Sequence, residues 1–211
     1  MQRKSLSEKT SPFYNYLEYL PPGYRSKRKI LWPLILFLHG AGERGNNLDI
    51  VKKVGLPPVL KKYTIPFVVI APQCGSHDTW AVDDVKSFLD YILEQYRIDH
   101  SRLYLTGISM GGYATWYMAG HLPDTFAAIA PVCGGGNIAQ AKKMVHLPVW
   151  AFHGAKDNIV PVERSRKMVD KLKKLGGNVR YTVYPDAGHD SWTETYNNPE
   201  LYEWFLEHRK Q

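Results

Sequence analysis

The sequence predicts an α/β fold, in which a mostly parallel sheet carries helices on both faces. Short apolar runs alternate along the chain with segments whose apolar residues recur at helical spacing. Most of these runs are continuous, as in strands that are covered on both faces. A chain of 211 residues is long enough for one such domain with a substantial core. We therefore expect residues 1–211 to form a single domain, in which residues 1–12 are a flexible N-terminal segment.

The expected strands follow the order of the apolar runs. The first, at residues 16–20, alternates between apolar and polar positions and ends at Pro21-Pro22-Gly23. The next, at residues 34–38, is the run Leu-Ile-Leu-Phe-Leu, which is typical of a strand buried on both faces. Further strands are expected at residues 67–71, 103–106, 127–130, 149–152 and 180–184.

Helical patterns lie between and after these strands. Residues 82–96 place apolar side chains at helical spacing behind an acidic first turn. Residues 112–119 follow the fourth expected strand and have helical character. A basic amphipathic helix is expected to begin at Pro161 and to end at Gly176-Gly177. Asn198 is the expected N-cap of the last helix, with proline at its first position.

The excess of positive charge does not predict nucleic-acid binding. The formal net charge is +7 and the pI is near 9.3, but the basic residues gather in one loop and along the amphipathic helix. On that helix they alternate with apolar residues, as on a solvated face. No nucleic-acid-binding motif accompanies them, so we expect no nucleic-acid partner.

Membrane, export and metal-binding signals are not apparent in the sequence. No apolar run reaches the roughly eighteen residues of a membrane-spanning helix. Residues 1–10 are polar and lack the apolar core of a secretory signal, which favours a cytoplasmic location. Cys74 and Cys133 are too few for a disulfide framework, and no His/Cys spacing indicates zinc. We expect both cysteines to be reduced and buried, although a disulfide between them stays an alternative.

The pentapeptide Gly107-Ile108-Ser109-Met110-Gly111 lies between an expected strand and an expected helix. This is the context of a nucleophile elbow, a turn so sharp that the serine hydroxyl stands clear of the sheet. The residues two before and two after the serine must be small, because strand and helix backbones would otherwise collide. A plain Gly/Ser turn is the alternative interpretation. The motif predicts Ser109 as the nucleophile of a serine hydrolase.

A serine nucleophile needs a base within hydrogen-bond reach, and His189 is the best candidate. It lies in the loop after the last expected strand, from which an imidazole can reach the sheet edge. The other histidines have polar, terminal or structural contexts. His153, for example, ends a strand and is expected to be packed or bonded to the backbone.

The base in turn needs a carboxylate that holds its tautomer, and Asp157 is the expected one. It follows the expected strand at residues 149–152. Asp186 and Asp190 compete, but both are too close to His189 in sequence to face its far ring nitrogen easily. Asp124 would come from the wrong loop.

Backbone amides are expected to stabilise the oxyanion of the tetrahedral intermediate. The amide of Met110 lies at a helix start, where unpaired amides favour an anion. The second donor is expected from the His39-Gly40-Ala41-Gly42 loop, through the amide of Ala41. His39 is expected to support this loop, and Glu43, Arg44 and Asn46 to hold it by hydrogen bonds.

Residues 36–45, the elbow and the loops of Asp157 and His189 together resemble the small bacterial α/β-hydrolase esterases. The similarity runs from about residue 16 to 208 and is greatest to the phospholipase/carboxylesterase and dienelactone-hydrolase-like group. This group overlaps with feruloyl and acetyl-carbohydrate esterases and with predicted peptidases. The resemblance implies an α/β-hydrolase fold with the order Ser109, Asp157, His189. Dienelactone hydrolases use a cysteine nucleophile, whereas this chain has serine, which favours simple ester hydrolysis.

We therefore expect a serine carboxylesterase that acts on short-chain or solvent-accessible esters, a small-molecule substrate, without metal or cofactor. Only residues 133–147 separate two strands where larger relatives insert a lid, so an open site without a lid domain is expected. Trp80 and Trp192 could form an aromatic wall for substrate or could pack at the sheet edge. Alternatives are a feruloyl or acetyl-carbohydrate esterase, a peptidase or thioesterase, and a non-catalytic binding protein.

Overall fold

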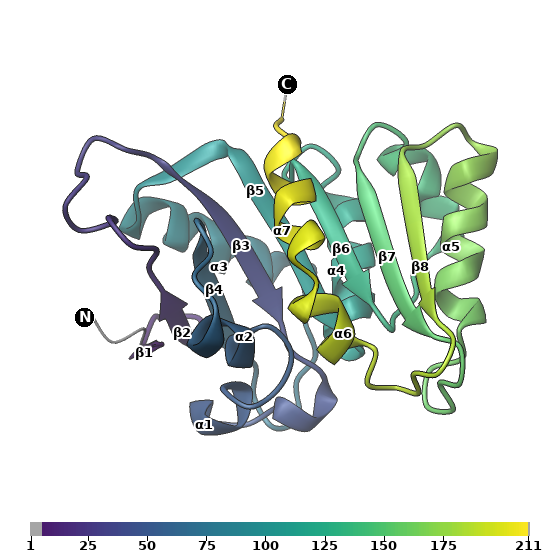
Figure 1. The fold of residues 1–211 in the computed structure, drawn as a ribbon, viewed down its shortest axis with the longest axis horizontal. Helices are drawn as coiled ribbons and strands as arrows, with labels where there is room; N and C mark the ends of the chain where they lie inside the picture. The colour runs from purple at the N-terminus through teal and green to yellow at the C-terminus, as the bar shows by residue number, and fades with distance from the viewer. Residues whose placement is uncertain (1–5, 211) are drawn as a thin grey trace.

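A computed structural model describes residues 6–210 and contains an eight-stranded sheet with the order β1-β2-β4-β3-β5-β6-β7-β8 (Figure 1). β1 and β2 are antiparallel to their neighbours, and the other strands are parallel. The strands are β1 (Ser7–Lys9), β2 (Asn15–Tyr19), β3 (Trp32–Leu38), β4 (Val68–Gln73), β5 (Ile98–Ile108), β6 (Ala128–Val132), β7 (Val149–Gly154) and β8 (Val179–Tyr184).

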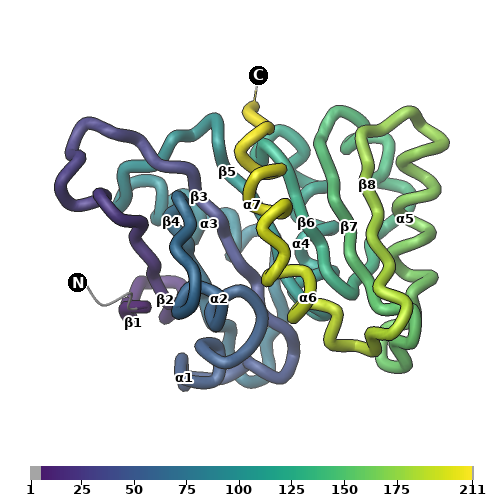
Figure 2. The backbone as a smooth tube through the Cα atoms, viewed as in Figure 1, coloured from purple at the N-terminus to yellow at the C-terminus, as the bar shows by residue number. Residues whose placement is uncertain are grey.

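Helices cover both faces of the sheet, with α2, α6 and α7 on one side and α3, α4 and α5 on the other (Figure 1). The tube in Figure 2 shows β2 near one end of the sheet and β8 at the other. The α-helices are α1 (Leu48–Val51), α2 (Pro57–Lys62), α3 (Val82–Gln95), α4 (Met110–His121), α5 (Glu163–Lys174), α6 (Trp192–Asn197) and α7 (Pro199–Glu207). Two 3₁₀ helices, η1 (Ala41–Glu43) and η2 (Ile138–Met144), complete the set.

The sheet separates two apolar clusters, and β3 contributes to both. Successive side chains of a strand point to opposite faces. Leu34, Leu36 and Leu38 accordingly pack with α3 and α4, whereas Ile35 and Phe37 pack with the helices on the other face. Every residue of β3 is buried, which explains why its sequence is continuously apolar. The fold is the predicted α/β-hydrolase fold.

The N-terminal segment differs in part from the expectation that residues 1–12 are flexible. Residues 1–5 lie outside the described part of the chain, but Ser7–Lys9 form β1. This strand pairs with β2 in a regular antiparallel register, and Lys9 lies 3.4 Å from the Glu18 carboxylate. Backbone pairing with β2 and the ion pair of Lys9 therefore form a strand in a segment whose polar composition did not predict one.

The connection from β6 to β7 is short, and within the described residues it holds only η2. Larger insertions that could cover the carboxyl ends of the strands do not occur there. Within residues 6–210, no helix has both the length and the apolar character needed to cross a bilayer.

Cys74 and Cys133 are both free thiols in the buried interior. Burial raises the pKa of Cys74 to about 11 and that of Cys133 to about 12. Both thiols are therefore buried and protonated at neutral pH. Because the thiolate is the reactive form of cysteine, neither is expected to react readily.

We predict that neither thiol reacts readily with a disulfide reagent in the native protein at mildly alkaline pH. Both should react at once in denaturant, because unfolding exposes them and returns each pKa to its ordinary range. Spectrophotometric thiol titration with and without denaturant checks this. Rapid native labelling of either cysteine would contradict the buried placement.

Candidate active site

Ser109 occupies the turn between the last residue of β5 and the first residue of α4. Its φ of 51° is positive, a conformation that non-glycine residues rarely adopt. The Ser109 amide is held by the Val132 carbonyl at 3.0 Å and by Cys133 Sγ at 3.2 Å. Strain of this kind persists only where the surroundings determine it, and it is typical of functional sites.

Glycines around Ser109 permit the close packing of α4 on the sheet. A Cβ on Gly111 would lie 2.0 Å from the Leu38 carbonyl oxygen, and one on Gly107 would lie 2.5 Å from the Gly111 oxygen. A Cβ on Gly112 would lie 2.2 Å from the Val132 oxygen. Side chains at these positions are therefore excluded by backbone atoms that cannot move aside. This is the steric requirement expected of a nucleophile elbow.

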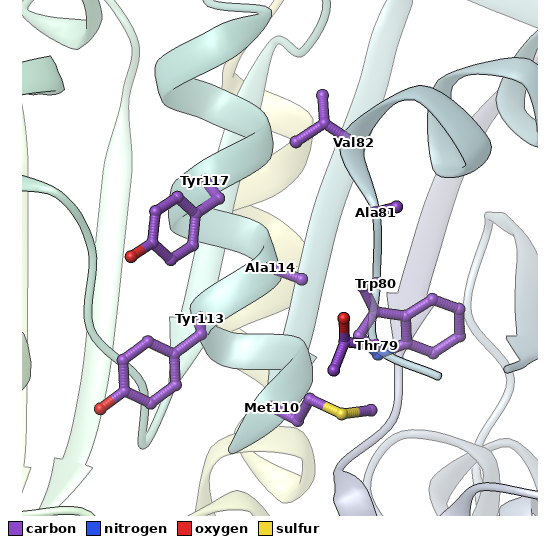
Figure 3. A pocket seen from close by; sticks show the side chains of 8 residues that line it. All are labelled: Thr79, Trp80, Ala81, Val82, Met110, Tyr113, Ala114 and Tyr117. Atoms are coloured by element: carbon purple, nitrogen blue, oxygen red, sulfur yellow. The ribbon is translucent and has the colours of Figure 1, made fainter. Parts of the chain in front are cut away.

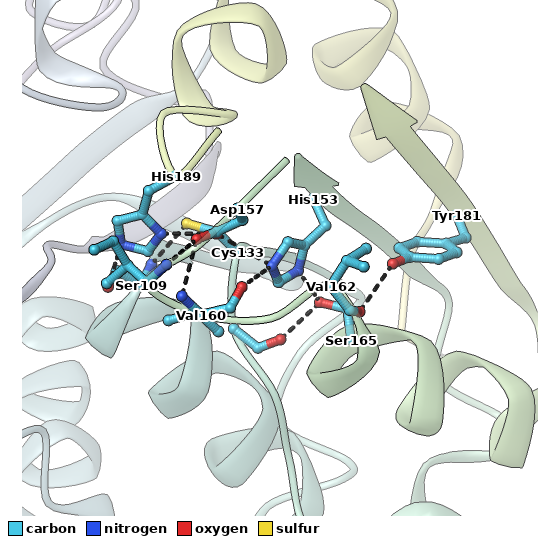
Figure 4. A network of polar contacts seen from close by, with 11 residues as sticks. Ser109, Cys133, His153, Asp157, Val160, Val162, Ser165, Tyr181 and His189 are labelled. Carbon is cyan, nitrogen blue, oxygen red and sulfur yellow. Dashed lines mark hydrogen bonds and ion pairs between the residues drawn. The ribbon is translucent and has the colours of Figure 1, made fainter. Parts of the chain in front are cut away.

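The three side chains that the sequence analysis singled out form a continuous hydrogen-bonded chain (Figure 4). His189 Nε2 lies 3.0 Å from Ser109 Oγ, and His189 Nδ1 lies 2.8 Å from Asp157 Oδ2. Because the carboxylate only accepts, Nδ1 must carry the hydrogen of a neutral imidazole. Nε2 is then free to accept the serine proton.

Asp157 is held as a carboxylate by donors on both of its oxygens. Oδ1 accepts hydrogen bonds from the amides of Ile159 and Val160, each at 2.9 Å, while Oδ2 faces His189. Burial alone would raise the pKa of Asp157, but the His189 and backbone donors outweigh it and hold this pKa below its usual value. Asp186 and Asp190 are exposed, and their contacts are with Lys156 and Thr193.

The loops that carry Asp157 and His189 lie directly against each other. The Lys156 amide donates to the Ala187 carbonyl at 3.0 Å. A Cβ on Gly154, the last residue of β7, would lie 2.1 Å from the Gly188 oxygen. This contact excludes a larger residue at position 154, and it brings together two loops that are about thirty residues apart in sequence.

The loop after β3, which contains Ala41, lies close to the nucleophile. Ala41 begins η1 and Met110 begins α4, and the first amides of a helix have no partner within it. The preceding residue, Gly40, lies close enough that an added Cβ would be 3.5 Å from Ser109 Cβ. Glu43 accepts the Gly40 amide at 3.0 Å, so this amide is already used.

His39 supports the loop, as its sequence context predicted. Its Nδ1 donates to the Gly40 carbonyl at 2.6 Å, while Nε2 accepts the Cys74 amide at 3.2 Å. Burial lowers the pKa of His39 to about 4, so the ring is neutral at physiological pH. Arg44 donates to the Ala41 carbonyl, but Gln73, which sequence reasoning missed, takes the place expected of Asn46 by donating to Glu43 and Asn47.

A groove of about 630 Å³ lies along α4, and its lining includes Met110, the residue after Ser109 in the sequence (Figure 3). Met110 extends from α4 toward the facing segment 79–82. Most of the lining is apolar or aromatic, and none of it is charged. The lining residues are Thr79, Trp80, Ala81, Val82, Met110, Tyr113, Ala114 and Tyr117.

The two tryptophans named as candidate substrate contacts have different surroundings. The Trp80 indole is 7% exposed, donates to the His39 carbonyl at 3.0 Å and packs edge-on against Tyr14. Trp80 thus belongs to the groove lining but is mainly packed. Trp192 begins α6, an element that the sequence analysis did not predict, and lies edge-on to His189 with ring centroids 5.4 Å apart.

A second serine–histidine pair, Ser165 and His153, lies near the first. Both side chains are fully buried, so neither can meet a substrate. The described residues contain no group of three or more His, Cys, Asp or Glu side chains arranged to hold a metal ion. The half-buried, strained Ser109 is therefore the nucleophile candidate that the geometry favours.

Gly111→Ala should lower the free energy of unfolding by about 1–3 kcal/mol, since the new methyl group overlaps the Leu38 carbonyl. Gly42→Ala is the matched control, because a Cβ there meets nothing within 4 Å. Urea unfolding of both variants measures the difference. Equal stability of the two would show that the elbow is less crowded than described.

Comparison with known proteins places these features in a family. The model of the dienelactone hydrolase family matches residues 70–202. A crystal structure of a thermostable esterase is 33% identical, with a TM-score of 0.80, covering 97% of this chain and 63% of that one. A bifunctional acetylxylan esterase/xylanase of Neocallimastix patriciarum is 33% identical over 102 residues, 44% of this chain and 15% of the relative.

A feruloyl esterase module from Clostridium thermocellum, solved with sinapinate, shares the fold with a TM-score of 0.73 at 17% identity, covering 97% of this chain and 87% of that one. The chain thus spans less than two thirds of both the thermostable esterase and the fungal enzyme. The matched region contains the elbow, both loops of the hydrogen-bonded chain and most of the sheet. The protein belongs to the dienelactone hydrolase family.

Proposed function

We propose that the protein is a serine carboxylesterase that hydrolyses solvent-accessible carboxylic esters through an acyl-enzyme intermediate. The observation that carries the proposal is the unbroken hydrogen-bonded chain from Asp157 through His189 to Ser109. A serine hydroxyl without a base that can take its proton is a weak nucleophile at neutral pH. The serine at position 109 also separates this chain from the cysteine-dependent dienelactone hydrolases that it resembles.

In the first half-reaction, Ser109 Oγ attacks the ester carbonyl carbon while its proton moves to His189 Nε2. Asp157 stabilises the imidazolium that forms. The negative charge that develops on the carbonyl oxygen accepts hydrogen bonds from the amides of Ala41 and Met110. The carbon–oxygen bond to the alcohol then breaks, and His189 returns its proton to the departing oxygen.

In the second half-reaction, water takes the place of the alcohol. Its oxygen attacks the acyl carbon while His189 accepts a proton, and the same two amides hold the oxyanion. Collapse of this intermediate releases the carboxylic acid and returns the proton to Ser109 Oγ. Each proton that His189 takes up is given back, so the side chain ends the cycle in its starting form.

The groove along α4 supports a substrate with an apolar or aromatic acyl group. Met110, Tyr113 and Tyr117 line the groove at helical spacing along α4, over a length of about 10 Å. The absence of charge in its lining disfavours ionic acyl groups. Tyr113 and Tyr117 suit an aromatic ring, such as that of a phenolic acid, and Trp192 borders the leaving-group side at His189.

Ser109→Ala should reduce ester turnover by several orders of magnitude with the fold intact, since the nucleophile is lost but the elbow backbone is not. Turnover of nitrophenyl esters and labelling by a fluorophosphonate probe measure this. Ser26→Ala, at an exposed loop serine, should match the wild type in both. Near-normal turnover in Ser109→Ala would end the proposal, and absent labelling of the wild type would favour a non-catalytic binding protein.

Tyr117→Ala should lower kcat/KM for bulky aryl-acyl esters roughly tenfold and leave acetyl esters little changed, because about 1–2 kcal/mol of apolar contact is lost only with the larger group. Tyr63→Ala is the control, since Tyr63 is exposed at the end of α2 and outside the groove. Kinetics on a panel of nitrophenyl, feruloyl and acetyl-sugar esters tests this. Equal losses for small and large acyl groups would place the acyl group elsewhere.

A further inference from the structure

A second histidine contacts the carboxylate that faces His189. His153 lies on β7, one residue before the strand ends, and its side chain is fully buried. Its Nε2 lies 2.8 Å from the Val160 carbonyl oxygen and 3.3 Å from Asp157 Oδ2 (Figure 4). Oδ2 therefore has two imidazoles within reach, His189 at 2.8 Å and His153 farther away.

The other ring nitrogen of His153 connects to two more segments of the fold. Nδ1 lies 2.6 Å from Ser165 Oγ on α5, and that oxygen lies 2.6 Å from the Gly134 carbonyl in the loop after β6. Ser165 and His153 are both fully buried. The ring thus joins β7, α5 and the loop behind the nucleophile in one water-excluded network.

The acceptors around His153 determine its tautomer. The Val160 carbonyl and the Asp157 carboxylate only accept hydrogen bonds, so Nε2 must carry a hydrogen. Nδ1 then lacks a hydrogen and, like the Gly134 carbonyl, can only accept the single hydrogen of the Ser165 hydroxyl. Burial lowers the pKa of His153 and favours this neutral form, while the Val160 carbonyl and Asp157 act in the opposite direction.

The hydrogen on His153 Nε2 also holds the turn that contains Asp157. Val160 donates its amide to Asp157 Oδ1 at 2.9 Å and receives the Nε2–H of His153 on its carbonyl. Both polar groups of this residue are thereby used, one to hold the carboxylate and the other to hold the turn against β7. Without the second bond, the turn would keep its own carboxylate contacts but lose this connection to β7.

We propose that His153 is a positioning residue for Asp157, which it orients through the Val160 carbonyl and through the second contact to Oδ2. The inference rests on the proposed function, because the orientation matters only if Asp157 supports His189 as a base. His153 cannot reach a substrate and takes no part in proton transfer. Its contribution is to keep the carboxylate where His189 Nδ1 requires it.

Two substitutions separate the roles of the two ring nitrogens. In His153→Gln, the amide nitrogen can occupy the place of Nε2, whereas in His153→Asn it can occupy only the place of Nδ1. We expect His153→Asn to lower kcat for a nitrophenyl acetate by about 10- to 100-fold, the effect of displacing a supporting group by around an ångström. KM should change little, and His153→Gln should restore most of kcat.

Rates are expressed per active site, counted by exhaustive fluorophosphonate labelling, so that loss of folded protein does not lower kcat. Unchanged turnover per site in both variants would overturn the proposal. Equal impairment of both would also overturn it, because the loss would then follow from the changed side-chain volume and not from the missing Nε2 hydrogen bond. If the wild type itself takes no label, the proposed function fails first, and the inference falls with it.

A measurement on the wild type keeps the inference testable if the variants do not fold. Nitrogen-15 NMR of the histidine side chains should find His153 as the Nε2–H tautomer, with a resonance that shifts in Asp157→Asn. An Nδ1–H tautomer, or a His153 resonance indifferent to that substitution, would overturn it.

Discussion

The close approach of α4 to the ends of β3 and β6 is the constraint on which the rest of the site depends. The first turn of α4 lies so near the Leu38 and Val132 carbonyls that Gly111 and Gly112 admit no side chain. This approach forces Ser109 into a positive φ and lifts its hydroxyl toward the open edge of the sheet. It also brings the start of α4 against the Leu38 and His39 carbonyls, directly before the loop of Ala41. The nucleophile and the proposed oxyanion donors therefore depend on the same packing contact.

Hydrogen bonds hold the other loops of the site in place around Ser109. His39 and Glu43 hold the Ala41 loop, and the turn of Asp157 is held by its own carboxylate. The histidine loop packs on Gly154, where no side chain could fit. The proposed catalytic groups thus lie on loops at the edge of the sheet, and contacts with the interior hold these loops in place.

The sequence predicted the sheet and the juxtaposition of Ser109, Asp157 and His189, because these depend on continuous apolar runs and on loop order. It did not predict β1, α1, α2 or α6, which are short and owe their form to tertiary contacts. The network of His153 and Ser165 was also missed. Its members are twelve residues apart on different elements, and only the packing of α5 on β7 brings them together. Tyr113 and Tyr117 lie on a predicted helix, but the groove that they line was not predicted. It forms only because the segment 79–82 packs near α4 in the folded chain.

The account stands or falls on whether Ser109 carries the acyl group during turnover. The most direct measurement is mass spectrometry of the enzyme quenched during hydrolysis of a slowly deacylated ester, followed by peptide mapping. We predict an acyl adduct on the peptide that contains Ser109, which disappears as the substrate is exhausted. Steady turnover with the adduct on another side chain, or with no adduct under conditions where deacylation limits the rate, would contradict the account.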